Sequence, residues 1–144
     1  MNTISTTITN TALQTVWIID DNDVDTMIGC KIIEKYDASI TTTAFNQPME
    51  AVKMLGNYIK NSPEKLPDLI FVDLYMPVLD GRGFLKVFEE LTKNDFPQIK
   101  IILLSSIGTD KDIPQPSNHP QLLGSLMKPI DLNKMRNIQN THFL

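Results

Sequence analysis

The stretch Ile70–Gly81, "IFVDLYMPVLDG", places a carboxylate, Asp73, directly after three large apolar residues. The surrounding segment "DLIFVDL" (68–74) has strand length and is apolar at successive positions, which indicates a strand covered on both faces. Strands of this kind belong to parallel sheets. We therefore interpret Asp73 as the end of a buried strand, where a rigid sheet can direct a carboxylate toward a ligand.

Four further segments of the chain are predicted to be strands. They are "TVWIID" (15–20), the β-branched "SITTTAF" (39–45), which we expect nearer an edge, "KIILLSS" (100–106) and the weaker "LLGSLMK" (122–128). Apolar residues recur at helical spacing between the strands, in residues 23–36, 47–60 and 82–93. Asn46 is expected to cap the second of these helices, with Pro48 in its first turn. The alternation predicts a right-handed, doubly wound α/β sheet with helices on both faces.

Composition and charge limit the class of protein. A chain of 144 residues that is 42% hydrophobic and 21% charged fits one globular domain. Its net charge of −4, with 13 Lys and Arg residues, provides no basic stripe, so we expect neither nucleic acid nor an anionic membrane as a partner. The lone Cys30 and the two histidines exclude an internal disulfide and a Cys/His zinc cluster.

The start of the chain is interpreted as a tail. Residues 1–14 are rich in Thr and Asn and lack the basic and apolar regions of a signal peptide. No apolar run of the sequence approaches the ~18 residues that a membrane span needs. We therefore expect a cytoplasmic protein in which residues 1–14 form a flexible N-terminal tail.

Polar side chains follow the predicted strands and form the candidate site. They are Asp20 and Asp21 after the first strand, Asp73 at the third, Ser105 at the fourth and Lys128 at the fifth. In doubly wound sheets, ligands bind outside the carboxyl ends of the strands, at the point where strand order reverses. We therefore expect three acids, a hydroxyl and an ammonium group to converge on one crevice.

The charges of this group indicate its chemistry. Two carboxylates ~4 Å apart repel by roughly 4 kcal/mol at an effective dielectric of ~20, so crowded acids must protonate or bind a cation. Mg²⁺ fits best, because it is commonly held by a few carboxylates beside phosphate. A cation, the Lys128 charge and the Ser105 hydroxyl also suit a phosphoryl group, and an Asp can act as the nucleophile that becomes phosphorylated.

Each residue taken alone also has a structural interpretation. The run Asp20–Asp23 could cap the next helix, and Asp80-Gly81 is interpreted as turn chemistry. Ser105 could bond to the backbone at a strand end, and Lys128 could be a solvated lysine. Pro129 could fix a turn through a cis bond. The joint placement at the ends of different strands favours the functional interpretation.

These residues resemble the receiver domains of two-component response regulators. "DLYMPVLDG" is similar to the segment around the phosphorylated aspartate of that family, and "IIDD", "LLSS" and "KP" are similar to its other three elements, in order. The resemblance covers about residues 15–140 and is to the stand-alone, chemotaxis-regulator-like type. It implies five parallel strands in the flavodoxin-like order 2-1-3-4-5 with five helices. Residues 15–144 would form the receiver domain, with no output domain.

The resemblance also implies roles for the site residues. They are Asp73 as phosphoacceptor, Asp21 and Asp73 as direct Mg²⁺ ligands, Asp20 assisting through water, the backbone carbonyl of Tyr75 as a further ligand, Ser105 contacting the phosphoryl group and Lys128 pairing with it. Phosphate would come from a sensor histidine kinase or a phosphotransfer protein. The receiver would catalyse only its own phosphorylation and dephosphorylation, and would act by docking on a separate downstream protein or as a phosphorelay intermediate, as a monomer or weak dimer.

Some positions depart from the usual pattern of that family. Ser125 occupies the place, three residues before the lysine, where many receivers carry an aromatic switch residue. Residues 107–121 contain three prolines, each costing ~3 kcal/mol inside a helix, so we expect at most a short helix around 109–113 and then an extended loop. His119 in this loop is expected to be solvated. The bulky Tyr75 and Ile107 predict slow self-dephosphorylation, because they could hinder the attacking water.

Two other classes of protein are considered. A haloacid-dehalogenase-like phosphatase would use Asp21, because Asp21–Val24 resembles the start of its DxDxV signature, with acids at the first and third positions. That family needs a further acidic pair after its lysine, whereas only Asp131 follows Lys128, and it leaves Asp73 unexplained. A non-phosphorylated binding scaffold is disfavoured because every acidic and phosphate-contacting position is filled.

Overall fold

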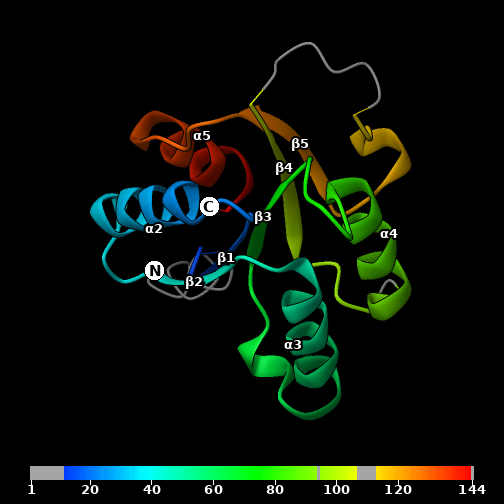
Figure 1. Ribbon diagram of the computed structural model, residues 1–144. Coiled ribbons are helices and arrows are strands. Elements are labelled where there is room, and N and C mark those ends of the chain that lie inside the picture. Colours follow the sequence, from blue (N-terminus) through cyan, green and yellow to red (C-terminus); the bar gives the residue numbers. More distant parts are fainter. Residues whose placement is uncertain (1–11, 94, 107–112, 144) are drawn as a thin grey trace, which may run out of the picture.

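A five-stranded parallel sheet forms the centre of the protein (Figure 1). The computed structural model describes residues 12–93, 95–106 and 113–143. The strands are β1 (Thr15–Ile19), β2 (Thr41–Phe45), β3 (Leu69–Asp73), β4 (Lys100–Ser105) and β5 (Leu122–Met127). They lie in the order β2-β1-β3-β4-β5, which confirms the predicted order and the edge position of the β-branched strand. The central strand β3 is buried along its whole length, as a strand between two helical layers must be.

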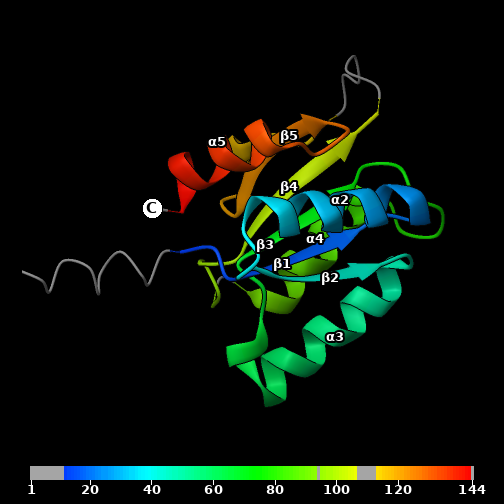
Figure 2. The same cartoon turned by 90° about the vertical axis from the view of Figure 1, so that its left-hand side faces the viewer.

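Helices cover both faces of the sheet (Figures 1 and 2). They are α2 (Asp23–Tyr36), α3 (Pro48–Asn61), α4 (Gly81–Thr92) and α5 (Leu132–His142), with the short 3₁₀ helices η1 (Pro63–Lys65) and η2 (Pro116–Asn118). Helices α3 and α4 pack on one face of the sheet, and α2 and α5 pack on the other. None of the helices that the structure describes has the length and apolar content that a membrane span requires.

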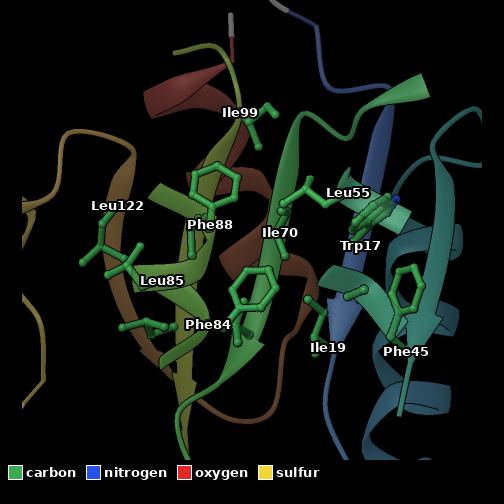
Figure 3. Close-up of a cluster of buried hydrophobic side chains, with 14 of the residues drawn as sticks. Trp17, Ile19, Phe45, Leu55, Ile70, Phe84, Leu85, Phe88, Ile99 and Leu122 are labelled. Atoms are coloured by element: carbon green, nitrogen blue, oxygen red, sulfur yellow. The ribbon is translucent and has the colours of Figure 1, made fainter. Parts of the chain in front are cut away.

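The core has two parts, one on each side of the sheet. Figure 3 shows the part under α3 and α4, where Trp17 lies against Phe45 with ring centroids 4.9 Å apart and Phe84 and Phe88 pack over the strands. The other part, under α2 and α5, contains Ile33. Burying a side chain of this size contributes roughly 1.5–3 kcal/mol. Two apolar layers of this kind hold the sheet rigid and so hold its strand ends in place.

Residues just before β1 belong to this packed unit. Leu13 is buried against the α2 and α5 side of the core. The backbone N–H of Gln14 donates to the Asp68 carboxylate at 2.9 Å, and its carbonyl accepts from the Thr41 N–H at 2.8 Å. Both residues fall within the predicted tail, residues 1–14, of which the first 11 lie outside the described residues.

The start of α3 corrects one prediction. The helix begins at Pro48, and its N-cap residue is Gln47, which makes no side-chain capping bond to the part of the chain that the structure describes. Asn46, the expected cap, instead donates through Nδ2 to Asp23 Oδ1 at 3.2 Å. Its amide therefore links the end of β2 to the first turn of α2.

The segment between β4 and β5 differs from the sequence-based expectations in two respects. Among its described residues, 113–121, the only helix is η2, where an extended loop was expected; the short helix expected around 109–113 lies largely outside the described residues. His119 is half-buried rather than solvated, because its Nδ1 lies 2.7 Å from Glu89 Oε2 on α4. The buried Gln121 donates through Nε2 to the carbonyls of Phe96 and Ile99, at 2.6 and 3.1 Å. These bonds attach the loop to α4 and to the start of β4.

Candidate functional site

The polar residues singled out in the sequence lie at the carboxyl ends of adjacent strands. Asp20 follows β1, Asp73 ends β3, Ser105 ends β4, and Lys128 follows β5. Because the strands are parallel, these carboxyl ends lie at the same end of the sheet, where Asp73 is paired with Leu104. Asp20, Asp73 and Ser105 are all buried, although each is polar. Polar groups are buried in this way only when they find partners.

Lys128 is the cationic partner of the Asp20 and Asp73 carboxylates. Its Nζ lies 2.6 Å from Asp20 Oδ2 and 3.3 Å from Asp73 Oδ2. A third carboxylate, Asp25 Oδ2 on α2, lies 3.0 Å from the same Nζ. The backbone N–H of Lys128 donates to the Ser105 carbonyl at 2.8 Å, and the Lys128–Pro129 peptide bond is cis. The structure therefore brings Asp20, Asp73 and Lys128 together as predicted and adds Asp25.

Sequence reasoning did not find Asp25. The residue lies in the first turn of α2, where an acid is usually explained by the helix dipole. Asn22 caps this helix, in agreement with the structural interpretation that the run Asp20–Asp23 could cap it. Asp25 and Lys128 are 103 positions apart. The one signal available was that Asp25 follows Asp21 by about one helical turn, so both can lie near the start of α2.

Three carboxylates at this edge form an oxygen-rich cluster. Ligand oxygens of Asp20, Asp21 and Asp73 all lie within 4.8 Å of one another, and of the three only Asp21 is exposed. Burial and the neighbouring Asp20 charge raise the pKa of Asp73 from 3.8 to about 7, although Lys128 opposes this. Burial alone would lower the pKa of Lys128, but hydrogen bonds to Asp20 and Asp25 raise it overall. One ammonium group therefore does not fully compensate the crowded negative charge.

This donor set fits a hard divalent cation. Carboxylate oxygens are the ligands that Mg²⁺ prefers, and an exposed Asp21 beside two buried acids leaves one side open to water and phosphate. Burial first, and then the neighbouring Asp20 charge, raise the pKa of Asp73, and a bound cation would offset both effects. The described part of the chain thus groups three carboxylates, Asp20, Asp21 and Asp73, whose oxygens are of the kind that Mg²⁺ prefers.

The loop after Asp73 is closely packed against the strand. The Tyr75 N–H donates to Asp73 Oδ1 at 3.2 Å, and the Gly81 N–H donates to the Leu74 carbonyl at 3.0 Å. Asp80 caps α4 by accepting from the Gly83 N–H, so the pair Asp80-Gly81 starts a helix as well as turning the chain. A Cβ on Gly81 would lie 2.8 Å from the Asp73 carbonyl oxygen, closer than such atoms approach. Glycine is needed here because helix and strand end are in direct contact.

Other residues named in the sequence analysis lie around the cluster. Tyr75 is 45% exposed, and the Arg82 guanidinium carbon lies 5.7 Å from its ring centroid. Ser125 lies on β5, exposed and paired with Leu103. Ile107, predicted to slow dephosphorylation together with Tyr75, falls outside the described residues. Tyr75 thus stands at the rim of the site, where its ring is accessible.

The fold and the cluster together define a flavodoxin-like domain with an acidic site at its strand ends. The response regulator receiver domain family matches residues 16–140, and the chain belongs to this family. The chain is similar in structure to a two-component response regulator from Cytophaga hutchinsonii, with a TM-score of 0.80, 20% identity and coverage of 90% of this chain and 96% of that one. Members of this family are signalling phosphoacceptors rather than classical enzymes.

Two further solved structures share the fold. A response regulator receiver protein from Dyadobacter fermentans matches with a TM-score of 0.73 and 23% identity, covering 89% of this chain and 96% of that one. The Mn²⁺-bound form of response regulator Rcp1 matches with a TM-score of 0.65 and 22% identity, covering 88% and 92%. The shared architecture agrees with the family assignment.

Proposed function

We propose that the protein is a two-component signalling protein that is phosphorylated on Asp73 with the help of Mg²⁺. The observation that carries this proposal is the position of Lys128 Nζ, 2.6 Å from Asp20 and 3.3 Å from Asp73, at the edge of a rigid parallel sheet. A buried carboxylate with a fixed cationic neighbour can take up a dianionic group at low reorganisation cost.

Mg²⁺ is assigned to the cluster at this edge. Asp21 and Asp73 would bind it directly, Asp20 would assist through water, and the backbone carbonyl of Tyr75 would complete the protein ligands. When bound, the cation would neutralise the carboxylates and the oxygens of the phosphoryl group. The related Rcp1 has been solved with Mn²⁺ bound, which supports a divalent cation in this fold.

The chain's own residues suit an in-line phosphoryl transfer. An Asp73 carboxylate oxygen attacks the phosphorus of a phosphohistidine, the P–N bond breaks, and the donor imidazole leaves with the electron pair. Lys128 balances the charge of the phosphoryl group, and the Ser105 hydroxyl, at the end of β4, contacts it. The Tyr75 N–H, which donates to Asp73 Oδ1, holds the carboxylate in a fixed orientation.

The donor and the output follow from the family role. The phosphate is supplied by a sensor histidine kinase or a phosphotransfer protein, and the phosphorylated chain acts by docking on a separate protein or by passing the phosphate on. Tyr75, two residues after Asp73, shields the acyl phosphate from water and slows self-dephosphorylation.

The phosphatase alternative finds less support around Asp21. Within the residues that resemble its DxDxV signature, the Asn22 side chain caps α2 by accepting from the Val24 and Asp25 N–H groups. Asp23 accepts from Asn46. Helix capping and a link to the end of β2 therefore account for Asn22 and Asp23 without phosphatase chemistry.

Phosphorylation by a small acyl phosphate tests the proposal. The protein is incubated with MgCl₂ and acetyl phosphate, and intact mass is followed for wild type, Asp73→Asn and Asp21→Asn. Asp80→Asn is the matched control, because Asn caps a helix as well as Asp does and Asp80 lies outside the cluster.

One phosphoryl adduct that disappears in Asp73→Asn and persists in Asp80→Asn is the expected result. Loss in Asp21→Asn with an intact adduct in Asp73→Asn would favour the phosphatase-like class. Absence of an adduct in all four proteins, also with a phosphorylated histidine phosphotransfer protein as donor, would favour the scaffold.

A further inference from the structure

Asp25 is the contact of Lys128 that the phosphoacceptor role does not explain. Its Oδ2 lies 3.0 Å from Lys128 Nζ, closer than Asp73 Oδ2 at 3.3 Å. The residue is held in place from its backbone, because its N–H donates to Asn22 Oδ1 at 3.1 Å in the cap of α2. Asp25 therefore reaches the lysine from a helix, whereas Asp73 reaches it from the sheet.

The three protons of the lysine ammonium group match three carboxylates. Asp20 is the shortest contact, at 2.6 Å, and its side chain is 1% exposed. The Asp25 side chain is 39% exposed, so water can replace the lysine as its partner at little cost. When a phosphoryl group joins Asp73 and requires Lys128, the contact to Asp25 is the one that can be given up most easily.

The surroundings of the lysine leave room for this exchange. A hollow of about 40 Å³ lies beside Nζ, and its charged lining residues are Asp20, Asp25 and Lys128. The other side chains of its wall, which include Ile28 and Leu104, are apolar. The charged side chains around this hollow are thus Lys128 itself and two of the carboxylates that contact its Nζ.

We propose that Asp25 is a positioning residue that competes with the phosphoryl group on Asp73 for Lys128. The inference rests on the proposed phosphorylation of Asp73. Asp25 keeps the ammonium group at the mouth of the site before phosphorylation and draws it away from the phosphoryl group afterwards. A carboxylate at this position therefore weakens the phosphorylated state and lowers the level of phosphorylation at a given donor concentration.

The test measures binding of beryllofluoride, which mimics a phosphoryl group on a carboxylate, to the whole chain. Its dissociation constant is determined by calorimetry in MgCl₂ for wild type, Asp25→Asn, Asp25→Glu and Asp23→Asn. Asp23→Asn is the matched control, since Asp23 lies in the same helical turn with the same charge but contacts Asn46. Urea unfolding of each protein verifies that the fold is intact.

The proposal expects Asp25→Asn to bind beryllofluoride about three- to fivefold more tightly, the range of a partly exposed ion pair. Asp25→Glu, which restores the charge, is expected to return toward the wild-type value, and Asp23→Asn to remain near it. An unchanged constant in Asp25→Asn, or an equal change in Asp23→Asn, would overturn the competition while leaving the phosphoacceptor intact. Failure of wild type to bind beryllofluoride, together with failure to form an adduct with acetyl phosphate or with a phosphorylated phosphotransfer protein, would overturn both proposals.

Discussion

Replacing Gly81 with alanine tests the close contact between the strand that carries Asp73 and the helix that follows it. A Cβ at this position would lie 2.8 Å from the Asp73 carbonyl oxygen and 2.9 Å from Leu74 Cα. Both are backbone atoms of a buried strand end, so neither can rotate away as the end of a side chain can. The first turn of α4 or the end of β3 must move to admit the methyl group.

The expected cost follows from two opposing effects. Overpacking a rigid site costs typically ~1–3 kcal/mol. Alanine gains up to ~1 kcal/mol over glycine in a helix interior, and less at the first helical residue, where Gly81 lies. We therefore expect Gly81→Ala to lower the free energy of unfolding by about 1–2 kcal/mol.

Gly56→Ala in α3 is the matched control. A Cβ there would meet nothing within 4 Å, so only the gain in helix propensity remains, and we expect this variant to be more stable by about 0.5–1 kcal/mol. Urea unfolding with a slope of roughly 2 kcal/mol per molar would then separate the two midpoints by roughly 1 M. If Gly81→Ala raised the midpoint as much as Gly56→Ala, the tight contact would be refuted.

The charges and buried bonds around the sheet lead to three further predictions. With divalent ions removed by a chelator, Asp73→Asn should become increasingly more stable than wild type between pH 5 and pH 7, by up to about 1.4 kcal/mol per pH unit. The reason is that the Asp73 pKa is about 7 in the folded protein and 3.8 in the unfolded chain. Wild type therefore loses stability as this carboxyl group ionises with rising pH, whereas the Asn variant does not. Urea unfolding at each pH measures this, and a constant difference contradicts it. Without divalent ions, Lys128→Ala should lower the free energy of unfolding by about 2–4 kcal/mol. Millimolar Mg²⁺ should raise the melting temperature of this variant more than that of wild type. Equal shifts would argue against the idea that Lys128 and Mg²⁺ both neutralise the same acids. Gln121→Leu should cost about 1–3 kcal/mol in urea unfolding because two backbone carbonyls lose their donor, and an unchanged midpoint would show that these bonds contribute nothing.

Much of the fold was predictable because its signals are local. The helical spacing in residues 23–36 corresponds to α2, Asp23–Tyr36, and the apolar run 68–74 corresponds to β3, Leu69–Asp73. Periodicity follows from the geometry of each element, so a short window of sequence carries it. The order of the strands does not follow from periodicity, and it came from the resemblance to receiver domains.

Loop residues were harder to predict, because their partners lie far away in the sequence. His119 was expected in solvent, but its Nδ1 lies 2.7 Å from Oε2 of Glu89, which is 30 positions earlier in the chain. Asn46 was expected to cap α3, but it bonds to Asp23 at the start of α2. Both side chains are polar and adaptable, so the partner depends on which elements pack beside them and not on the local pattern.

Local sequence patterns are enough to place the strands and helices and to put acids, a hydroxyl and a lysine at strand ends, because an apolar run followed by a polar residue marks the end of a buried strand. Two features become visible only in the folded protein: Asp25 shares Lys128 with Asp20 and Asp73, and Gly81 has no room for a methyl group. These are distances between segments far apart in the chain. They are set by the packing of helices on the sheet, which no local pattern of residues encodes.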